Sequence, residues 1–315
     1  MRNNINLITI VTACYNESEN IDTLYSRVLD TLQKNLNNLN YEFIFIDNAS
    51  TDNTVDKIKQ IIKKDKNVKL IVNSRNFGHI RSPFHAILQS KGDVTISLVA
   101  DLQDPPEMIP QFLERWKEGN DIVLGIKKSS KENSLMFSIR KIYYRILAKL
   151  SDIEIYQNFT GFGLYDKRVI DSLKQMRDPY PFFRGMIAEV GLSVSQIQYD
   201  QPVRTRGLTK NNIYTLYDIG ILGIINNSKI PLRLAIFLGG IFGVFSFLIG
   251  LVYLVTKVLY WDTMDIGVAP IIILTSFMFS ALLLFIGILG EYVGAIYTQV
   301  LDRPLVFEKE RVNFK

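Results

Sequence analysis

Two kinds of hydrophobic pattern divide the chain. Up to about residue 210, short apolar runs recur, and each is followed by a polar or glycine-bearing turn and then by apolar residues at helical spacing. Beyond residue 230 the pattern changes to two long stretches without a charged side chain. The first part predicts a globular α/β domain, and the second predicts a pair of membrane helices.

The alternation within residues 1–210 predicts the order of strands and helices. Strands are expected at 7–13, 42–46, 68–72, 94–99 and 122–124, and helices at about 18–36, 53–64, 79–90, 106–118 and 134–150. Strands that alternate with helices in this way form right-handed crossovers and a mostly parallel, doubly wound sheet. We expect this sheet to close before the membrane helices, so that the domain folds without the residues after about 228.

The two uncharged stretches cover residues 234–256 and 266–290. As helices they are each about 35 Å long, and the hydrocarbon core of a bilayer is about 30 Å thick. Because only nine residues connect them, a hairpin at 231–295 is expected, with an apolar interfacial helix before it at 211–230 and a tail after it at 296–315. The alternative, two buried helices of a soluble protein, is weaker because core helices rarely stay uncharged over this length.

Charge asymmetry predicts the orientation of the hairpin. Basic residues flank its outer ends (Lys229, Arg233, Arg303, Lys309 and Arg311), whereas the connection carries only Lys257. The positive-inside rule therefore places both termini and the α/β domain in the cytoplasm, in a multi-pass protein of the cytoplasmic (inner) membrane. The first residues lead directly into a strand pattern, so no signal peptide is expected.

Length and composition exclude several classes of protein. A chain of 315 residues with 48% hydrophobic residues can bury a sizeable core, which excludes disorder. A net charge of +5 is too small to indicate binding to nucleic acid. Because Cys14 is the single cysteine, an internal disulfide and a metal site built of thiolates are excluded. The chain has only two histidines, which argues against a histidine-rich metal centre. A cation held by carboxylates remains compatible with the composition.

Polar side chains follow four of the predicted strands. These segments are TACYNE at 12–17, DNASTD at 47–52, SRNFG at 74–78 and ADLQDPP at 100–106. The carboxyl ends of parallel strands meet at one edge of a sheet, where α/β proteins bind their ligands. Helix capping explains single members of this set but explains all four segments poorly. Since the chain lacks both the G-x-G-x-x-G and the P-loop motif, phosphates would be neutralised by a cation on Asp101 and by basic side chains.

In their order, and with the hairpin behind them, these segments resemble those of a known family. TACYNESENI, IFIDNASTDNT, NSRNFGH and VADLQDPPEMIP are similar to the motifs of family 2 glycosyltransferases of GT-A fold, in the branch that makes polyprenyl-phosphate sugars. Dolichyl-phosphate mannose synthases and bactoprenol glucosyltransferases belong to this branch. The resemblance covers nearly the whole chain and implies a Rossmann-like domain that transfers a sugar, with UDP-glucose as the expected donor, to undecaprenyl phosphate for cell-surface glycans.

The resemblance assigns the donor site to the strand ends. Glu17, Asp47 and, less specifically, Arg75 are implied to bind the nucleotide. Asp101 and Gln103 are implied to hold a Mg²⁺ or Mn²⁺ ion that bridges the two phosphates, which makes Asp101 catalytic. The alternative role for Asp101 is that of a helix cap.

Further roles are implied for residues after the sheet. Arg204, Arg206 and Lys210 in RTRGLTK resemble a mobile basic loop that contacts the diphosphate or the acceptor phosphate, and Arg206 is counted as catalytic. Glu189 is a secondary candidate, for a sugar hydroxyl. The resemblance also implies membrane lipid as a partner and a homo-oligomer, with a tetramer as the form that it suggests.

The chain departs from the family pattern at two positions. Val99 stands where relatives have the first aspartate of the metal segment, and Gly161 stands where they have the aspartate of a Gly-Asp-Phe-Arg segment. A phosphomonoester acceptor has a second pKa near 6, so it is an anion at pH 7 and needs no strong base. The missing carboxylates are therefore compatible with a single displacement that inverts the anomeric carbon.

Two other functions remain open from the sequence. The same fold can transfer a sugar to a hydroxyl of a glycolipid or polysaccharide, although two spans are too few for a polymer channel. A non-catalytic membrane scaffold is the alternative from another class, and Val99 is compatible with it.

Overall fold

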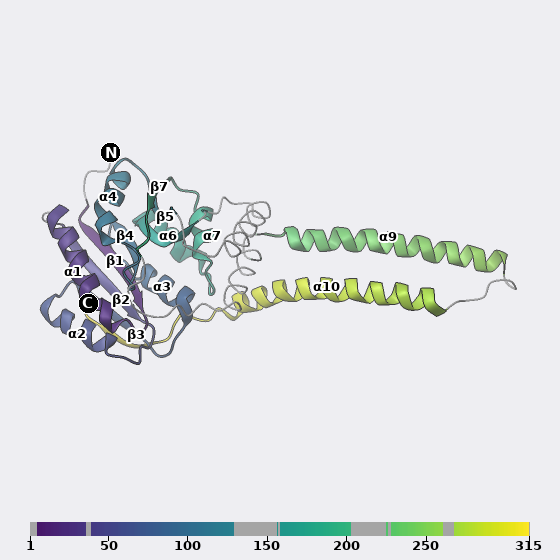
Figure 1. The fold of residues 1–315 in the computed structure, drawn as a ribbon, viewed down its shortest axis with the longest axis horizontal. Helices are drawn as coiled ribbons and strands as arrows, with labels where there is room; N and C mark the ends of the chain where they lie inside the picture. Colours follow the sequence, from purple (N-terminus) through teal and green to yellow (C-terminus); the bar gives the residue numbers. More distant parts are fainter. Residues whose placement is uncertain are drawn as a thin grey trace.

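The computed structural model describes residues 5–35, 39–128, 156, 158–202, 225, 228–260 and 268–314. An α/β domain carries a helical hairpin that projects away from it (Figure 1). In chain order the elements are β1 (Leu7–Cys14), α1 (Ser18–Asn35), β2 (Asn40–Asp47), α2 (Thr54–Lys64), β3 (Val68–Asn73), α3 (Gly78–Leu88), β4 (Val94–Val99), the 3-10 helix η1 (Pro106–Met108), α4 (Ile109–Lys117), β5 (Ile122–Lys127), β6 (Phe159–Asp166), α6 (Lys167–Met176), α7 (Phe183–Glu189), β7 (Val194–Tyr199), α9 (Ile230–Leu259), α10 (Val268–Leu301) and β8 (Glu308–Val312).

The domain is built on one eight-stranded sheet with the order β7-β5-β6-β4-β1-β2-β3-β8. The neighbours β1–β2, β1–β4, β2–β3 and β5–β7 are parallel, and β6 and β8 run antiparallel to their neighbours. The predicted mostly parallel α/β sheet is thus confirmed. The five predicted strands are present, and four of them are longer by one to three residues than their apolar runs.

Helices cover both faces of the sheet. Alternate side chains of β2 point to opposite faces of the sheet. Phe43 and Phe45 belong to the hydrophobic cluster that includes α1, α2 and α4. Ile44 and Ile46 belong to the cluster that includes α3, α6 and α7. All four of these side chains are fully buried. The two hydrophobic layers fix the sheet between them, and they leave the strand ends as the places where polar side chains gather.

One expectation about domain boundaries is wrong. The predicted tail at 296–315 does not leave the domain, because α10 continues to Leu301 and residues 308–312 return to form β8 beside β3. The sheet therefore closes only after the hairpin, and a chain cut near residue 228 lacks its edge strand. The sequence EKERV carries four charges in five residues, so it shows no apolar run that would predict a strand.

The hairpin consists of α9 and α10, both long and apolar enough to cross a membrane. They contain most of the predicted stretches 234–256 and 266–290. Their bases are joined by a hydrogen bond of 2.6 Å from the Tyr292 hydroxyl to the Ser228 carbonyl oxygen. The predicted helices at 134–150 and 211–230 fall almost wholly outside the described residues, as does most of the connection between α9 and α10.

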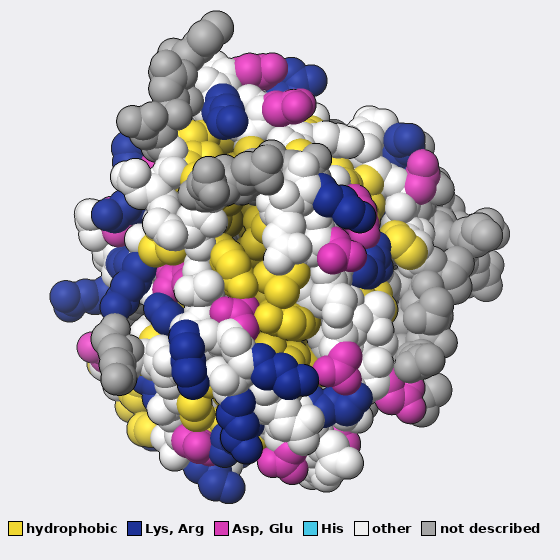
Figure 2. Space-filling model, turned by 90° about the vertical axis from the view of Figure 1, so that its left-hand side faces the viewer, with side chains coloured by type: hydrophobic (Ala, Val, Ile, Leu, Met, Phe, Trp, Pro, Cys, Tyr) yellow, Lys and Arg dark blue, Asp and Glu magenta, His cyan; other side chains and the backbone are white. Residues whose placement is uncertain are grey.

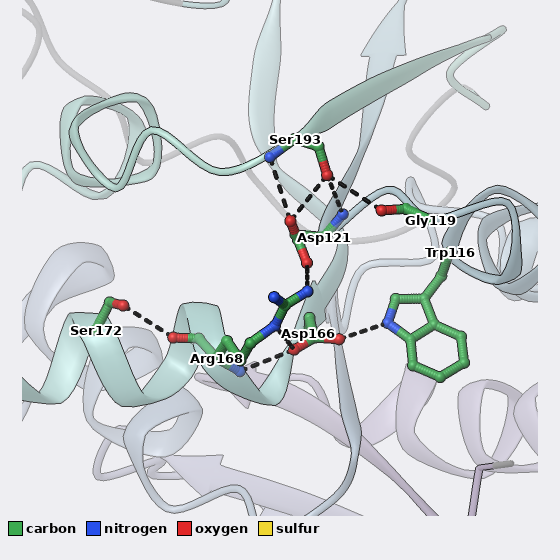
Figure 3. Close-up of polar contacts among 7 residues, drawn as sticks. All are labelled: Trp116, Gly119, Asp121, Asp166, Arg168, Ser172 and Ser193. Carbon is green, nitrogen blue, oxygen red and sulfur yellow. Dashed lines mark hydrogen bonds and ion pairs between the residues drawn. The ribbon is translucent and has the colours of Figure 1, made fainter. Parts of the chain in front are cut away.

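The amino edge of the sheet carries a closed polar network (Figure 3). Asp121 accepts hydrogen bonds from the Ser193 hydroxyl at 2.8 Å and from the Arg168 guanidinium. Asp166 caps α6 and accepts a bond of 2.8 Å from the indole of Trp116. Because these bonds join α4, β5, β6, α6 and the start of β7, they are structural.

The end of the domain opposite the hairpin shows acidic and basic side chains interspersed rather than a broad basic surface (Figure 2).

Candidate active site

The loops after β1 and β2 are tied to each other at the carboxyl edge. The backbone amide of Asn16 donates to the Ser50 hydroxyl at 2.9 Å, and the side-chain oxygen of Asn16 accepts from the backbone amide of Thr51 at 2.8 Å. The Asn48 amide donates to the Cys14 carbonyl oxygen at 2.9 Å. These bonds hold two of the four predicted segments, 12–17 and 47–52, in contact with each other.

A network of asparagine side chains around the buried Asn48 connects these two loops to the loop after β3. The side-chain oxygen of Asn48 accepts from the Phe77 amide at 2.9 Å and from the Asn73 amide group at 3.1 Å. Its side-chain nitrogen donates to Asn76 at 2.9 Å and to the Gly78 carbonyl oxygen at 3.0 Å. Asn48 thus sets where the third segment lies, a role that the sequence did not reveal because asparagines in turns are common.

Three loops of this edge contain left-handed residues. Asn16, Ala49 and Leu102 have φ angles of 56°, 62° and 63° and follow β1, β2 and β4 within three residues of the strand end. Ala49 and Leu102 have no polar side chain to stabilise this conformation, which is uncommon for residues other than glycine. Such conformations cluster at functional sites, where surrounding contacts hold them. Their position supports the assignment of the site to this edge.

Asp101 and Gln103 lie on the loop after β4. The Asp101 carboxylate, half-buried, accepts a hydrogen bond of 3.1 Å from the Gln103 amide, so both side chains start from one tight turn. Among the described residues, no group of three or more His, Cys, Asp or Glu side chains forms a metal site. One carboxylate and one amide oxygen fit a Mg²⁺ or Mn²⁺ ion that takes its other ligands from substrate phosphates and water. Val99, 40% exposed, adds no ligand to this set.

Asp104 anchors this loop from beneath. It is 1% exposed, and it accepts hydrogen bonds from the Val99 amide at 3.1 Å and from the Tyr199 hydroxyl at 2.9 Å. Burial raises the pKa of Asp104 to about 6. The carboxylate thereby joins the end of β4 to the end of β7 and fixes where the segment with Asp101 leaves the sheet.

Changing Asp104 to asparagine is expected to alter how stability depends on pH. The folded-state pKa of about 6 exceeds the ordinary 3.8, so wild-type stability is lost as the pH rises from about 4 through 6. Asparagine stays neutral, and its amide group can accept from Val99 and donate to the Tyr199 oxygen. Relative to the wild type, Asp104→Asn should gain up to about 3 kcal/mol between pH 4 and pH 7. Thermal unfolding of the metal-free full chain in one detergent measures this, and a difference in Tm that is constant with pH would contradict it.

The predicted donor-binding residues differ in how accessible they are. The Glu17 side chain is half-buried, accepts a bond of 2.6 Å from Asn20, and lies at the start of α1. Asp47 is fully buried, and it accepts a bond of 2.9 Å from the Ser50 amide. Burial raises the pKa of Asp47, and the bonds from Ser50 oppose this increase. In this structure the Asp47 carboxylate is therefore closed to solvent and stabilises its own loop.

The segment around Gly161 cannot easily take the side chains that relatives have there. Gly161 has a φ of +104°, a conformation in which an L side chain is strained. At Gly163, a Cβ atom would lie 2.4 Å from the Val123 carbonyl oxygen of β5. The backbone at Gly161 and the close approach of β5 and β6 at Gly163 thus disfavour the aspartate and the arginine that the family pattern would place there.

The remaining predicted residues are Glu189, the three basic residues after the sheet, and Arg75. Glu189 ends α7 and is exposed, and four residues later Ser193 binds Asp121 at the opposite edge. Arg204, Arg206 and Lys210 lie outside the described residues. Arg75 does lie at the carboxyl edge, at its outer end, where its guanidinium is 4.1 Å from the centre of the Phe77 ring.

The carboxyl edge faces the base of the hairpin. Because β8 runs antiparallel to β3, the tail enters the sheet at the end of β3, where the Ser74 amide donates to the Phe307 carbonyl oxygen at 2.8 Å. Only residues 302–307 connect this point to the end of α10, and the Arg81 guanidinium holds the Pro304 carbonyl oxygen at 2.7 Å. The polar strand ends therefore lie on the side of the domain from which α10 projects (Figure 1).

Comparison with known proteins agrees with this architecture. Residues 9–174 match the model of the glycosyl transferase family 2. The chain is 30% identical to an uncharacterized glycosyltransferase of Synechocystis over 95% of its length and 93% of the relative's. It is 29% identical to the SfII prophage-derived bactoprenol glucosyl transferase of Shigella flexneri, over 94% of its length and 96% of the relative's.

Solved structures align at low similarity. The 1–349 fragment of S. aureus TarS in complex with UDP-GlcNAc is 15% identical and aligns over 70% of this chain and 67% of its own, with a TM-score of 0.41. The family match spans more than half of the chain, and the relatives span nearly all of it. The protein belongs to glycosyltransferase family 2, and its domain has the GT-A fold, followed by two apolar helices.

Proposed function

We propose that this glycosyltransferase transfers a sugar from a nucleotide sugar to polyprenyl phosphate at the membrane surface. The observation that carries the proposal is the position of the carboxyl edge, which holds Asp101 and is connected through six residues to the end of α10. A lipid-linked acceptor can reach such a site without leaving the bilayer. The similarity to a bactoprenol glucosyl transferase along almost the entire chain supports the same acceptor class.

In this proposal the residues have the following roles. Glu17 and the loop shaped by Asp47 receive the nucleoside, next to Asp101 and Gln103, which hold the cation with the diphosphate. A bound Mg²⁺ or Mn²⁺ stabilises the negative charge that develops on the departing nucleoside diphosphate. The acceptor phosphate is already ionised, so the chain has to position it in line with the anomeric carbon, and the product has inverted configuration. Arg204, Arg206 and Lys210 are proposed to contact the phosphates.

The donor is proposed to be UDP-glucose and the acceptor undecaprenyl phosphate. The test is to incubate the purified full chain with undecaprenyl phosphate, Mg²⁺ and a panel of UDP- and GDP-sugars, and to identify the lipid product by mass spectrometry. A single hexosyl-phosphate lipid from one donor supports the proposal. Turnover of no donor would favour the scaffold alternative.

A protein base is not expected to be needed. Turnover should fall as the pH drops through the acceptor's second pKa near 6, because protonation removes the attacking anion. The same fall should be measured in Glu189→Gln, since Glu189 is exposed at the end of α7. Loss of turnover in this variant with intact donor binding would instead support a protein base and a hydroxyl acceptor.

The sheet supports an even number of membrane crossings. The hairpin is inserted between β7 and β8, which belong to one sheet, so both ends of the hairpin lie on the side of the domain. The basic residues at those ends favour the cytoplasm for both. Cysteines introduced at Asp262 in the connection and at Lys309 in β8 should therefore react with an impermeant thiol reagent from opposite sides. Labelling from the same side would contradict this topology.

A further inference from the structure

Three arginines gather where the carboxyl edge meets the hairpin. Arg75 follows β3, Arg81 lies in α3, and Arg303 comes two residues after the end of α10. The guanidinium carbons of Arg75 and Arg81 lie 4.1 Å and 5.5 Å from the centre of the same Phe77 ring. Arg81 also binds the carbonyl oxygen of Pro304, the residue after Arg303. Two neighbouring segments and a third from the other end of the chain thus bring three positive charges together.

No carboxylate compensates these charges within the part of the chain that the structure describes. None of the ion pairs that the described residues form includes Arg75, Arg81 or Arg303. Glu308, the first residue of the tail strand, is engaged instead by His85 at 2.7 Å and by Arg311. Among the described residues, the cluster therefore carries positive charge that no ion pair compensates.

The surroundings of Arg81 are unfavourable for its positive charge and leave one of its donors unbonded. Burial lowers the pKa of Arg81, and the charges of Arg75 and Arg303 lower it further. Its Nε atom is buried without a hydrogen-bond partner among the described residues. A buried donor without an acceptor costs about 1–3 kcal/mol, and a bound anion would remove both this cost and the repulsion.

The position of the cluster indicates where such an anion would come from. The last turns of α10 expose the apolar side chains of Val293, Ile296, Tyr297 and Val300, each more than half exposed. This helix is apolar enough to span a membrane up to Leu301, so Arg303 follows at the depth of the lipid headgroups. The anions that are concentrated at this depth are lipid phosphates.

We propose that Arg75, Arg81 and Arg303 bind the phosphate group of a membrane lipid at the junction of the carboxyl edge and α10. Guanidinium groups suit this ligand because each can donate two parallel hydrogen bonds to phosphate oxygens. The phosphate belongs either to an acidic phospholipid or to a polyprenyl phosphate waiting beside the site. Bound there, it would hold the loop after β3, α3 and the tail together at the membrane surface.

Lipid binding by the full chain in neutral detergent tests this without donor, metal or turnover, so its outcome is independent of the proposed function. Native mass spectrometry gives the affinities for phosphatidylglycerol, undecaprenyl phosphate and the zwitterionic phosphatidylcholine. Arg81→Gln/Arg303→Gln should bind its preferred phosphate lipid at least about tenfold more weakly than the wild type. Arg303→Gln alone changes an exposed residue, and it should show a smaller loss with an unchanged Tm. The matched control Arg115→Gln/Lys117→Gln removes two exposed charges from α4 and should bind as the wild type does.

The lipids distinguish the two sources of the phosphate. Tighter binding of phosphatidylglycerol than of undecaprenyl phosphate identifies a phospholipid, and the reverse order identifies the acceptor. Equal binding of phosphatidylcholine by the wild type, or unchanged affinity in the double variant, would overturn the proposal. Competition by inorganic phosphate at the same concentration as the lipid would also overturn it, since the site would then recognise a free anion.

Discussion

Replacing Asp101 by asparagine is expected to lower kcat at least about a hundredfold, which corresponds to about 2.7 kcal/mol in the activation free energy. Asp101 is half-buried on the turn that carries Gln103, whereas Asp104 of the same segment is buried and Val99 offers no carboxylate. Without the Asp101 carboxylate, the cation would not be held where charge develops on the departing diphosphate, a contribution of several kcal/mol. The asparagine oxygen can still accept from the Gln103 amide, so the loop and the fold should persist.

Steady-state kinetics with added Mg²⁺ or Mn²⁺ measure this effect, and EDTA should inactivate the wild type reversibly. Asp22→Asn is a suitable control because Asp22 is an exposed residue of α1 paired with Lys57. Near-normal activity of Asp101→Asn, or indifference of the wild type to EDTA, would contradict a metal role and leave Asp101 as a residue that stabilises its own turn through the Gln103 amide, since it caps neither η1 nor α4. The basic loop that contains Arg204 and Arg206 would then have to stabilise the leaving group.

Deleting residues 304–315 is expected to lower the free energy of unfolding of the α/β domain by about 3 kcal/mol or more. The deletion removes β8 and the buried Val306, and it leaves the edge of β3 unpaired. It also removes the ion pair between Glu310 and Lys59 and the bond between Glu308 and His85. These contacts attach the tail to α2 and α3, on both faces of the sheet.

Thermal unfolding in one detergent should show a decrease in Tm of at least about 6 °C for the deletion. Lys309→Gln, a change at an exposed position of the same strand, should leave Tm unchanged. A deletion variant as stable as the full chain would mean that β8 is only an accessory to the sheet. A truncated chain of residues 1–228 should likewise be less stable than a variant in which a linker joins residue 228 to residue 303.

The sequence predicted the strands that carry strong apolar runs, and these strands hold four of the site's segments. It did not predict three strands: β8, whose charged residues form no apolar run, β7, whose sequence VSQIQY is largely polar, and β6, in which Gly161 and Gly163 interrupt the apolar pattern. The sequence predicted the candidate site at the carboxyl edge because the ends of parallel strands must meet there, and the structure brings β1, β2, β3 and β4 together in parallel as this prediction requires.

What the sequence could not show was how the loops are held. Asn48 and Asp104 act through bonds to residues that are distant in the chain, such as Asn73 and Tyr199. Asparagines and aspartates are common in turns because they bond to their own backbone, so their presence in a loop does not indicate a distant partner. The juxtaposition of Arg81 and Arg303 likewise depends on the return of the tail after the hairpin, which no local pattern indicated.

The acceptor is the central claim, and one comparison tests it most directly. The full chain is given the same nucleotide sugar with undecaprenyl phosphate or with undecaprenol, which has the same chain but ends in a hydroxyl, and the lipid products are identified by mass spectrometry. We predict a hexosyl-phosphate lipid from undecaprenyl phosphate and no glycolipid from undecaprenol. A glycosylated product from undecaprenol, or donor turnover that does not require undecaprenyl phosphate, would contradict the account.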